Sequence, residues 1–418
     1  MTLHVQTVIV GGGQAGLSTS YHLAQHGHEH VVLEQAARPA SAWRDGRWDS
    51  FTLVTPNWTF RLPGAEYQGP DPAGYMPRDE IVACFERYVQ QFGLPVRTGT
   101  RVLAVEPAPG GAGYIVQAED ERFAAANVVM ATGVYQQPKV PAFAANLPAG
   151  VLQLHSGQYR NPAMLPAGAV LVVGSGQSGC QIAEELTQAG RQIYLSTGTT
   201  GRAPRRYRGR DFFDWLVTIG FFDRTVDMLP SPQARFLSPP QLSGKDGGHS
   251  LNLHQFARDG VVLLGHVVGA QGGRLGLAPD LPANLARSDQ FEVEILKQVD
   301  AYIARNGLDA PEEKVVQLRH GYEAPILLDL DLARAGIGSI VWAAGYRSDY
   351  TLIRLPILDS SGLLRARRGA TDFRGLYFAG QPWQPSLKSA FLLGVGESTA
   401  GIAAQIVEEK AMPVAKAS

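Results

Sequence analysis

The sequence predicts an α/β protein with two Rossmann-like dinucleotide-binding domains, the second inserted in the first. Three observations lead to this prediction. A glycine-rich loop, Gly11-x-Gly13-x-x-Gly16, directly follows the apolar run Val8-Ile9-Val10. A second loop, Gly174-x-Gly176-x-x-Gly179, directly follows the apolar run at residues 170–173. Each loop lies between a buried-strand pattern and a helical pattern, which is the context of a genuine dinucleotide fingerprint.

The three glycines of such a loop have separate tasks. The first makes the tight turn, the second lets the backbone approach a pyrophosphate, and the third permits close packing of helix and strand. The N-terminus of the following helix then stabilises the phosphate charge. We therefore expect cofactor contacts from both loops and their first helical residues: Gly11, Gly13, Gln14, Ala15, Gly16, Gly174, Ser175, Gly176, Gln177, Ser178 and Gly179.

The two units differ at the position that selects the nucleotide. Glu34 ends the strand pattern of the first unit, 18 residues after Gly16, where a carboxylate accepts hydrogen bonds from a ribose diol. The same step in the second unit reaches Thr197, preceded by Ser196, and a run of arginines starts at Arg202. Hydroxyls and a guanidinium suit a 2′-phosphate, which a carboxylate would repel. The first loop is therefore predicted to bind FAD and the second NADPH.

Composition excludes several classes of protein. A formal net charge of −1 and a pI near 6.8 over 418 residues give no broad basic surface for nucleic acid. The sequence lacks an apolar run near 18 residues and a signal-peptide pattern, so we expect no membrane span and a cytoplasmic location. Cys84 and Cys180 are isolated in helical patterns, which excludes a flavin–disulfide relay, and no metal site is predicted.

The first 165 residues are predicted to form the first part of the FAD domain. Apolar residues at helical spacing predict a helix at 77–92, and a strand-rich stretch with a glycine-rich turn follows at 96–116. The apolar run at 128–130 ends in Ala131-Thr132-Gly133, small residues that let the chain leave the sheet beside the cofactor.

Residues 166–338 are predicted as the NADPH domain, with an irregular insertion at about 205–330 that helps wall the substrate cavity. The segment at 340–346 repeats the pattern of an apolar strand, small residues and glycine, and is expected to return the chain to the FAD domain at 339–418. The N-terminus of a last helix, after Gly396, would stabilise negative charge on the reduced flavin. Further cofactor contacts are expected from Gln35, Trp43, Arg44, Val102, Ala131, Thr132, Gly133, Ala344, Gly345, Gly380 and Gly396.

These motifs resemble those of the class B flavin-dependent monooxygenases, which include the flavin-containing, Baeyer–Villiger, YUCCA-type and N-hydroxylating enzymes. The resemblance covers nearly the whole chain and is weakest across 205–330. It rests on the paired loops, on the segments at 129–135 and 342–346, and on His155 with Tyr159. The linker motif of the family is matched in part, because Ala149 and Val151 stand at its Phe and Gly positions, and residues 41–42 replace two glycines of the loop before Trp43.

The resemblance implies that NADPH reduces FAD and that O₂ then forms a C4a-(hydro)peroxyflavin. One oxygen atom passes to a small organic substrate by N- or S-oxygenation or a Baeyer–Villiger insertion. Asn57 lies near where flavin-containing monooxygenases keep an active-site asparagine, although a turn asparagine after proline is an equal alternative. Arg347 is a second catalytic candidate, with a surface salt bridge as its alternative. For His155 a structural role is favoured over proton transfer.

Two other functions stay open. One is an NAD(P)H-dependent flavin oxidoreductase that passes electrons to a quinone or a protein. The other is a non-catalytic nucleotide-binding redox sensor. The sequence does not identify the substrate, the type of oxygenation or the oligomeric state, for which a homodimer is one option.

Overall fold

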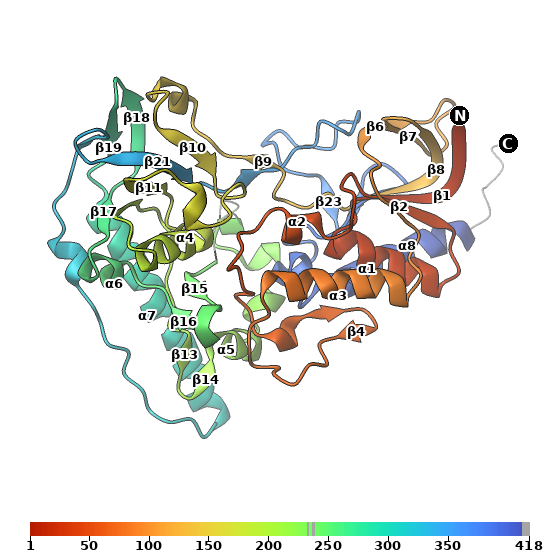
Figure 1. The fold of residues 1–418 in the computed structure, drawn as a ribbon. Coiled ribbons are helices and arrows are strands. Elements are labelled where there is room, and N and C mark those ends of the chain that lie inside the picture. Colours follow the sequence, from red (N-terminus) through yellow and green to blue (C-terminus); the bar gives the residue numbers. More distant parts are fainter. Residues whose placement is uncertain (232–233, 236–238, 412–418) are drawn as a thin grey trace.

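The computed structural model describes residues 1–231, 234–235 and 239–411, and Figure 1 shows two lobes side by side. One lobe contains β1 (Thr2–Val10) and the other contains β11 (Ala169–Val173). Each has a sheet with parallel strands and helices packed against it. Among the described residues, no helix is both long and apolar enough to cross a membrane.

The first sheet contains nine strands in the described part of the chain. Its central run β25-β8-β1-β2-β5 is parallel, and the antiparallel hairpin β6–β7 joins β8 from the side. Val8 and Ile9 are fully buried, as expected for a parallel strand covered on both faces. The remaining strands are β2 (His30–Leu33), β5 (Val96–Arg97), β6 (Val102–Pro107), β7 (Tyr114–Ala118), β8 (Arg122–Met130), β23 (Ala366–Arg367), β24 (Ala370–Thr371) and β25 (Leu376–Phe378).

The second sheet is parallel, in the order β10-β21-β11-β12-β17. Its other strands are β10 (Leu152–His155), β12 (Ile193–Ser196), β17 (Val262–Leu264) and β21 (Ile337–Trp342). Two sequence predictions are therefore wrong. The segment at 340–346 does not return to the first sheet, because β21 pairs with β10 and β11. The stretch at 205–330 is not only an insertion, because it supplies β17 to the main sheet.

The helices confirm most of the predicted periodicities. The predicted helix at 77–92 is α3 (Arg78–Gln91), and the longest helix, α7 (Leu281–Asn306), lies in the stretch expected to be irregular. The other α-helices of the described chain are α1 (Gln14–Gln25), α2 (Ser41–Arg44), α4 (Gln177–Gln188), α5 (Phe212–Thr218), α6 (Leu253–Arg258) and α8 (Val395–Ala411). The small antiparallel sheets are formed by β3 (Arg61–Leu62) with β4 (Ala65–Glu66), β9 (Gln137–Pro138) with β22 (Tyr346–Arg347), β13 (Arg206–Tyr207) with β14 (Arg210–Asp211), β15 (Leu242–Ser243) with β16 (His249–Ser250), and β18 (Val267–Gln271) with β19 (Arg274–Leu277) and β20 (Asp329–Asp331).

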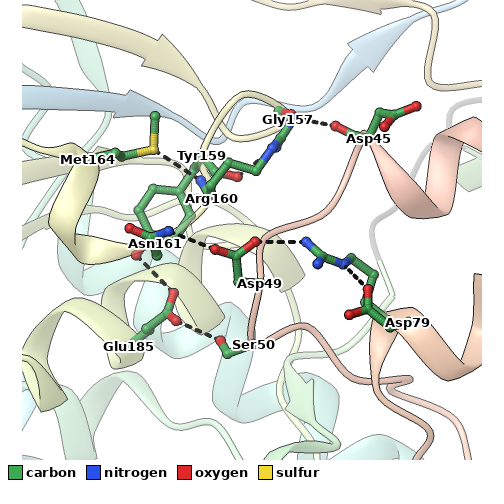
Figure 2. Close-up of polar contacts among 11 residues, drawn as sticks. Asp45, Asp49, Ser50, Asp79, Gly157, Tyr159, Arg160, Asn161, Met164 and Glu185 are labelled. Carbon is green, nitrogen blue, oxygen red and sulfur yellow. Dashed lines mark hydrogen bonds and ion pairs between the residues drawn. The ribbon is translucent and has the colours of Figure 1, made fainter.

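A polar network joins the loop after α2 to the second lobe (Figure 2). Asp49 accepts hydrogen bonds from Asn161 at 2.7 Å and from Arg78 at 2.9 Å, and these two contacts lower the pKa of Asp49. Ser50 donates to Glu185 of α4 at 2.6 Å, and the buried Tyr159 donates to the other oxygen of that carboxylate at 2.8 Å. The chain segment that follows β10 is thereby tied to both lobes.

Arg202 is buried against α7 instead of lying free at the end of β12. Its side chain is 2% exposed and forms ion pairs with Glu292 at 2.8 Å and with Asp289 at 3.2 Å. It also donates to Gln317 at 2.9 Å. Because two carboxylates surround one guanidinium, this cluster would repel a phosphate. The predicted contact of Arg202 with a 2′-phosphate is therefore corrected.

We predict that Arg202→Met lowers the free energy of unfolding by about 3–5 kcal/mol, because it leaves the buried carboxylate of Glu292 without its cation. Denaturant unfolding followed by tryptophan fluorescence measures this change. Arg274→Met is the matched control, since its side chain is 59% exposed and lies 3.6 Å from Asp329; it should cost less than about 1 kcal/mol. Equal losses in the two variants would contradict the assignment.

Candidate functional site

The two glycine-rich loops have the same backbone geometry. Gly11 has a φ of +112° and Gly174 a φ of +109°, which only glycine adopts readily. A Cβ atom on Gly16 would lie 1.9 Å from the carbonyl oxygen of Gly11, and one on Gly179 would lie 1.8 Å from that of Gly174. The first and third glycines of both loops are therefore required by backbone conformation and by close packing.

The middle glycine of each loop faces open space. A Cβ on Gly13 would meet no atom within 4 Å, and one on Gly176 would meet only the hydroxyl of Thr200 at 3.9 Å. These two glycines are the N-caps of α1 and α4, and neither first helical turn contains an acidic residue. Each loop is thus a cradle with free space and a helix N-terminus, which fits the pyrophosphate of a dinucleotide.

Glu34 fastens the end of β2 to the first loop. Its carboxylate accepts hydrogen bonds from the amide of Gly12 at 2.7 Å and from the amide of Ala36 at 2.9 Å, and its side chain is buried. A carboxylate oxygen has more than one lone pair, so the group retains acceptor capacity at the predicted ribose position. The neighbouring Gln35 is exposed.

The end of β12 in the second unit carries no carboxylate. The hydroxyls of Ser196 and Thr197 are buried and donate to the carbonyls of Gly265 and Leu264 at 2.9 and 2.8 Å. They therefore bind the end of β12 to the chain at β17, and the expectation that these hydroxyls hold a phosphate is corrected. The amide of Gly198 donates to the hydroxyl of Ser175 at 2.9 Å. In the first unit the loop donates to the strand end, from Gly12 to Glu34, whereas in the second unit the strand end donates to the loop.

In both lobes the chain leaves the sheet through a short run of small residues, called a crossing below. The first crossing is residues 131–133, after β8, and the second is residues 343–345, after β21. A Cβ on Gly11 would lie 2.5 Å from the carbonyl oxygen of Ala131, and one on Gly174 would lie 2.6 Å from that of Ala343. Gly133 and Gly345 then turn the chain with φ values of +73° and +78°. The repeated pattern at 340–346 marks the corresponding crossing of the second sheet. The predicted residues Thr132 and Ala344 lie in these two crossings.

His155 ties β10 to the second crossing. Its Nδ1 accepts from the amide of Gly157 at 3.2 Å, so its Nε2 carries the proton and donates to the carbonyl of Gly345 at 3.0 Å. Burial lowers the pKa of His155, and its ring contacts Tyr346 at a centroid distance of 4.6 Å. These contacts support the structural role that the sequence favoured for this histidine.

The two predicted catalytic residues do not lie in comparable settings. Asn57 is 4% exposed, donates to the carbonyl of Asp71 at 2.9 Å and accepts from the amide of Met76 at 2.6 Å. Both ends of its amide hold the 71–76 loop, which favours the turn-residue alternative over a catalytic role. Arg347 is exposed on β22, in the ribbon that β22 forms with β9 near the second crossing.

Three further predicted residues, Trp43, Arg44 and Val102, have different surroundings. Trp43 packs against Phe85 and Phe51, whereas Arg44 pairs with Glu86 at 2.7 Å and donates to Pro39. Arg44 thus fastens α2 to α3, and its assignment as a cofactor contact stays a prediction. Val102 is buried at the start of β6.

Two glycines near the C-terminus contact α1, and the first of them permits close packing on it. A Cβ on Gly380 would lie 2.6 Å from the Cβ of Ala15, and the carbonyl of Gly396 accepts from His22 at 3.1 Å. The side chain of Gln14 donates to Ala390 at 2.7 Å. The segment after β25 therefore lies over the first turn of α1, where the first loop faces open space.

Sequence analysis missed Arg47, whose guanidinium carbon lies 5.3–5.6 Å from the ring centroids of Trp43, Phe51 and Tyr135. No local motif marks this residue. The only indication in the sequence is that Arg47 follows Trp43, a predicted cofactor contact, by four residues.

Comparison with known proteins identifies the family. Residues 8–210 match the model of the pyridine nucleotide-disulphide oxidoreductase family. The chain is 31% identical to a CzcO-like oxidoreductase of Geobacillus kaustophilus, over 94% of this chain and 95% of the relative. Both cysteines of the present chain are free, Cys84 on α3 and Cys180 on α4.

Solved structures of flavin enzymes share the fold. The ornithine N-hydroxylase of Kutzneria sp. 744, with reduced FAD, NADP⁺ and L-ornithine, has a TM-score of 0.66 at 17% identity, over 97% of this chain and 100% of that one. The flavin-containing monooxygenase of Stenotrophomonas maltophilia has a TM-score of 0.64 at 20% identity, over 98% and 99%. The bacillithiol disulfide reductase of Staphylococcus aureus reaches 0.61 at 13% identity, over 98% and 99%. The chain is thus an oxidoreductase that belongs to the CzcO-like family and has the fold of the class B flavin monooxygenases.

Proposed function

We propose that the protein is an NADPH- and O₂-dependent FAD monooxygenase that transfers one oxygen atom to a small organic substrate. The observation that carries the proposal is the pair of nucleotide loops. A Cβ on the third glycine would meet the carbonyl oxygen of the first at 1.9 Å in one loop and 1.8 Å in the other, but their strand ends carry different chemistry. One chain therefore offers two dinucleotide sites of different preference.

The first loop fits FAD. The open space at Gly13 can take a pyrophosphate at the N-terminus of α1, and Glu34 can accept from the adenosine ribose. The first sheet, with the chain from 376 onwards, would form the FAD domain. The second sheet, including β10 and β21, would form a nicotinamide-nucleotide domain inserted in it.

The second loop fits NADPH better than NADH. Thr197 stands where the first unit has Glu34, so no carboxylate would repel a 2′-phosphate or accept from a 2′-hydroxyl. A Cβ on Gly198 would have His266 Nε2, at 3.7 Å, as its nearest neighbour. With Arg202 committed to α7, the imidazole of His266 lies next to this strand end, and its Nδ1 pairs with the carboxylate of Asp280.

FAD, once reduced by NADPH, would supply the activation of O₂. The protein would position the two nucleotides and the substrate and would exclude water. His155 holds the second crossing in place through Gly345, and the contacts of Asp49 and Ser50 with Asn161 and Glu185 fix the relative position of the lobes. These residues act on geometry and do not transfer protons.

A flavin oxidoreductase is the second candidate, favoured by the structural likeness to a disulfide reductase. The cysteines do not support the disulfide branch, because Cys180 is fully buried and burial raises the pKa of its thiol, as it also does for Cys84. A quinone or a protein acceptor stays compatible with the two nucleotide sites.

Oxygen labelling separates the two candidates. With ¹⁸O₂, NADPH and a panel of small sulfides, amines and ketones, we expect one labelled oxygen atom in a product. Mass spectrometry of the products measures the label. NADPH turnover that continues without O₂ on a quinone, with no labelled product in air, would instead establish the oxidoreductase.

Substitution of the two middle glycines should separate the cofactors. Gly13→Ala should weaken FAD binding by about 10- to 100-fold, because the added methyl group displaces a charge-assisted hydrogen bond to phosphate worth about 1.5–3 kcal/mol. Gly176→Ala should retain FAD and weaken NADPH by a similar factor. Flavin content after acid precipitation and NADP⁺ titration measure the two affinities. FMN in place of FAD, or the same defect in both variants, would contradict the assignment.

A carboxylate placed at the end of β12 should change the nucleotide preference. Gly198→Asp should raise the Kd of NADPH by on the order of tenfold, about 1.4 kcal/mol, through repulsion of the 2′-phosphate, and leave that of NADH nearly unchanged. Gly198→Asn is the neutral control of the same shape. If Asp and Asn variants bind NADPH equally, the 2′-phosphate does not lie at this strand end.

A further inference from the structure

Arg47 carries a charge that no described carboxylate compensates. None of the ion pairs within residues 1–231, 234–235 and 239–411 involves it. Among the described residues, its side chain forms one hydrogen bond, from Nη1 to the carbonyl of Gly46 at 3.1 Å. A guanidinium has five N–H donors in one plane, so most of the donors of Arg47 are available to another acceptor.

The neighbouring arginines are committed. Arg44 pairs with Glu86, and Arg78 pairs with Asp49 and Asp79. Arg160 donates to the carbonyls of Gly157, Tyr159 and Asp45, and Figure 2 shows these four residues together. Arg47 is held differently, by aromatic rings, and a cation–π contact leaves the in-plane donors free.

The rings around Arg47 come from the carboxyl ends of parallel strands. Trp43 lies on α2 after β2, and Tyr135 follows the crossing at the end of β8. Tyr135 contacts Tyr346, which follows the crossing at the end of β21, at a centroid distance of 5.4 Å. Ligands of open α/β sheets bind at this edge. Arg47 therefore lies where chain segments from both sheets meet.

The region is partly open. Tyr135 is 62% exposed. Burial raises the pKa of Tyr346, while the nearby charges of Arg47 and Arg160 lower it. An anion at this position would meet a forked donor and an aromatic wall, and it would not have to displace a carboxylate.

We propose that Arg47 binds the carboxylate of the substrate, and that the substrate class is a small organic acid with an apolar or aromatic body. This inference rests on the proposed function, because it names the substrate of the same site. A nucleotide phosphate is the weaker occupant, since each pyrophosphate already has a glycine loop and a helix N-terminus, and neither loop is lined by rings. The rings of Trp43 and Tyr135 would contact the body of the acid.

The test measures binding to the FAD-loaded protein without turnover. Phenylacetate and phenylacetamide are the probes, because they share a body and differ in charge. By calorimetry we expect phenylacetate to bind at least tenfold more tightly than phenylacetamide. Arg47→Met should abolish this preference, and Arg47→Lys, which keeps the charge but loses the fork, should retain part of it.

Arg61→Met is the matched control, because Arg61 also lies over a tryptophan ring, that of Trp58 at 5.2 Å, but is exposed on β3. It should leave the preference unchanged. FAD content and the Kd of NADP⁺ should be the same in all variants, which also shows that they fold. Equal binding of acid and amide, a preference that survives Arg47→Met, or a loss of NADP⁺ affinity in that variant would overturn the proposal. Because the readout is binding, a failure of the oxygen-labelling experiment would leave the Arg47 result interpretable.

Discussion

The site depends on one constraint, the direct contact of helix backbone with loop backbone at Gly16 and Gly179. A side chain at either position would collide with a carbonyl oxygen less than 2 Å away. This contact places the first turns of α1 and α4 at the ends of β1 and β11. It also leaves open space at Gly13 and Gly176. The helix N-termini, the neighbouring crossings and the residues that follow them are positioned by this packing.

Since the two units share this geometry, their difference arises from side chains at the strand ends. Glu34 accepts from the first loop, whereas Ser175 of the second loop accepts from the strand end at Gly198. The same backbone can thus serve two nucleotides in one chain. The unpaired charge of Arg47 lies near both units. The anion that it is proposed to bind would therefore lie between the two units.

The parts of the structure set by local chemistry could be predicted from the sequence. Both loops, Glu34, the helix α3 and the small-residue crossings follow from spacing, and the structure contains them. The partner of a side chain is set by distant residues, and here prediction failed. Arg202 pairs with α7, about 90 residues later, and Asn57 holds the 71–76 loop. The pattern at 340–346 does not indicate which sheet this segment joins, because the same pattern occurs once in each sheet.

The junction between the lobes has a consequence for mutational tolerance. Arg160 holds the loop after α2 through the main-chain carbonyl of Asp45, and its other acceptors are main-chain carbonyls as well. A main-chain acceptor persists whatever side chain the residue carries. The identity of residue 45 can therefore drift without loss of this tie, whereas a change at Arg160 would remove all three contacts at once. For this contact, only the Arg160 side of the junction depends on the identity of a side chain.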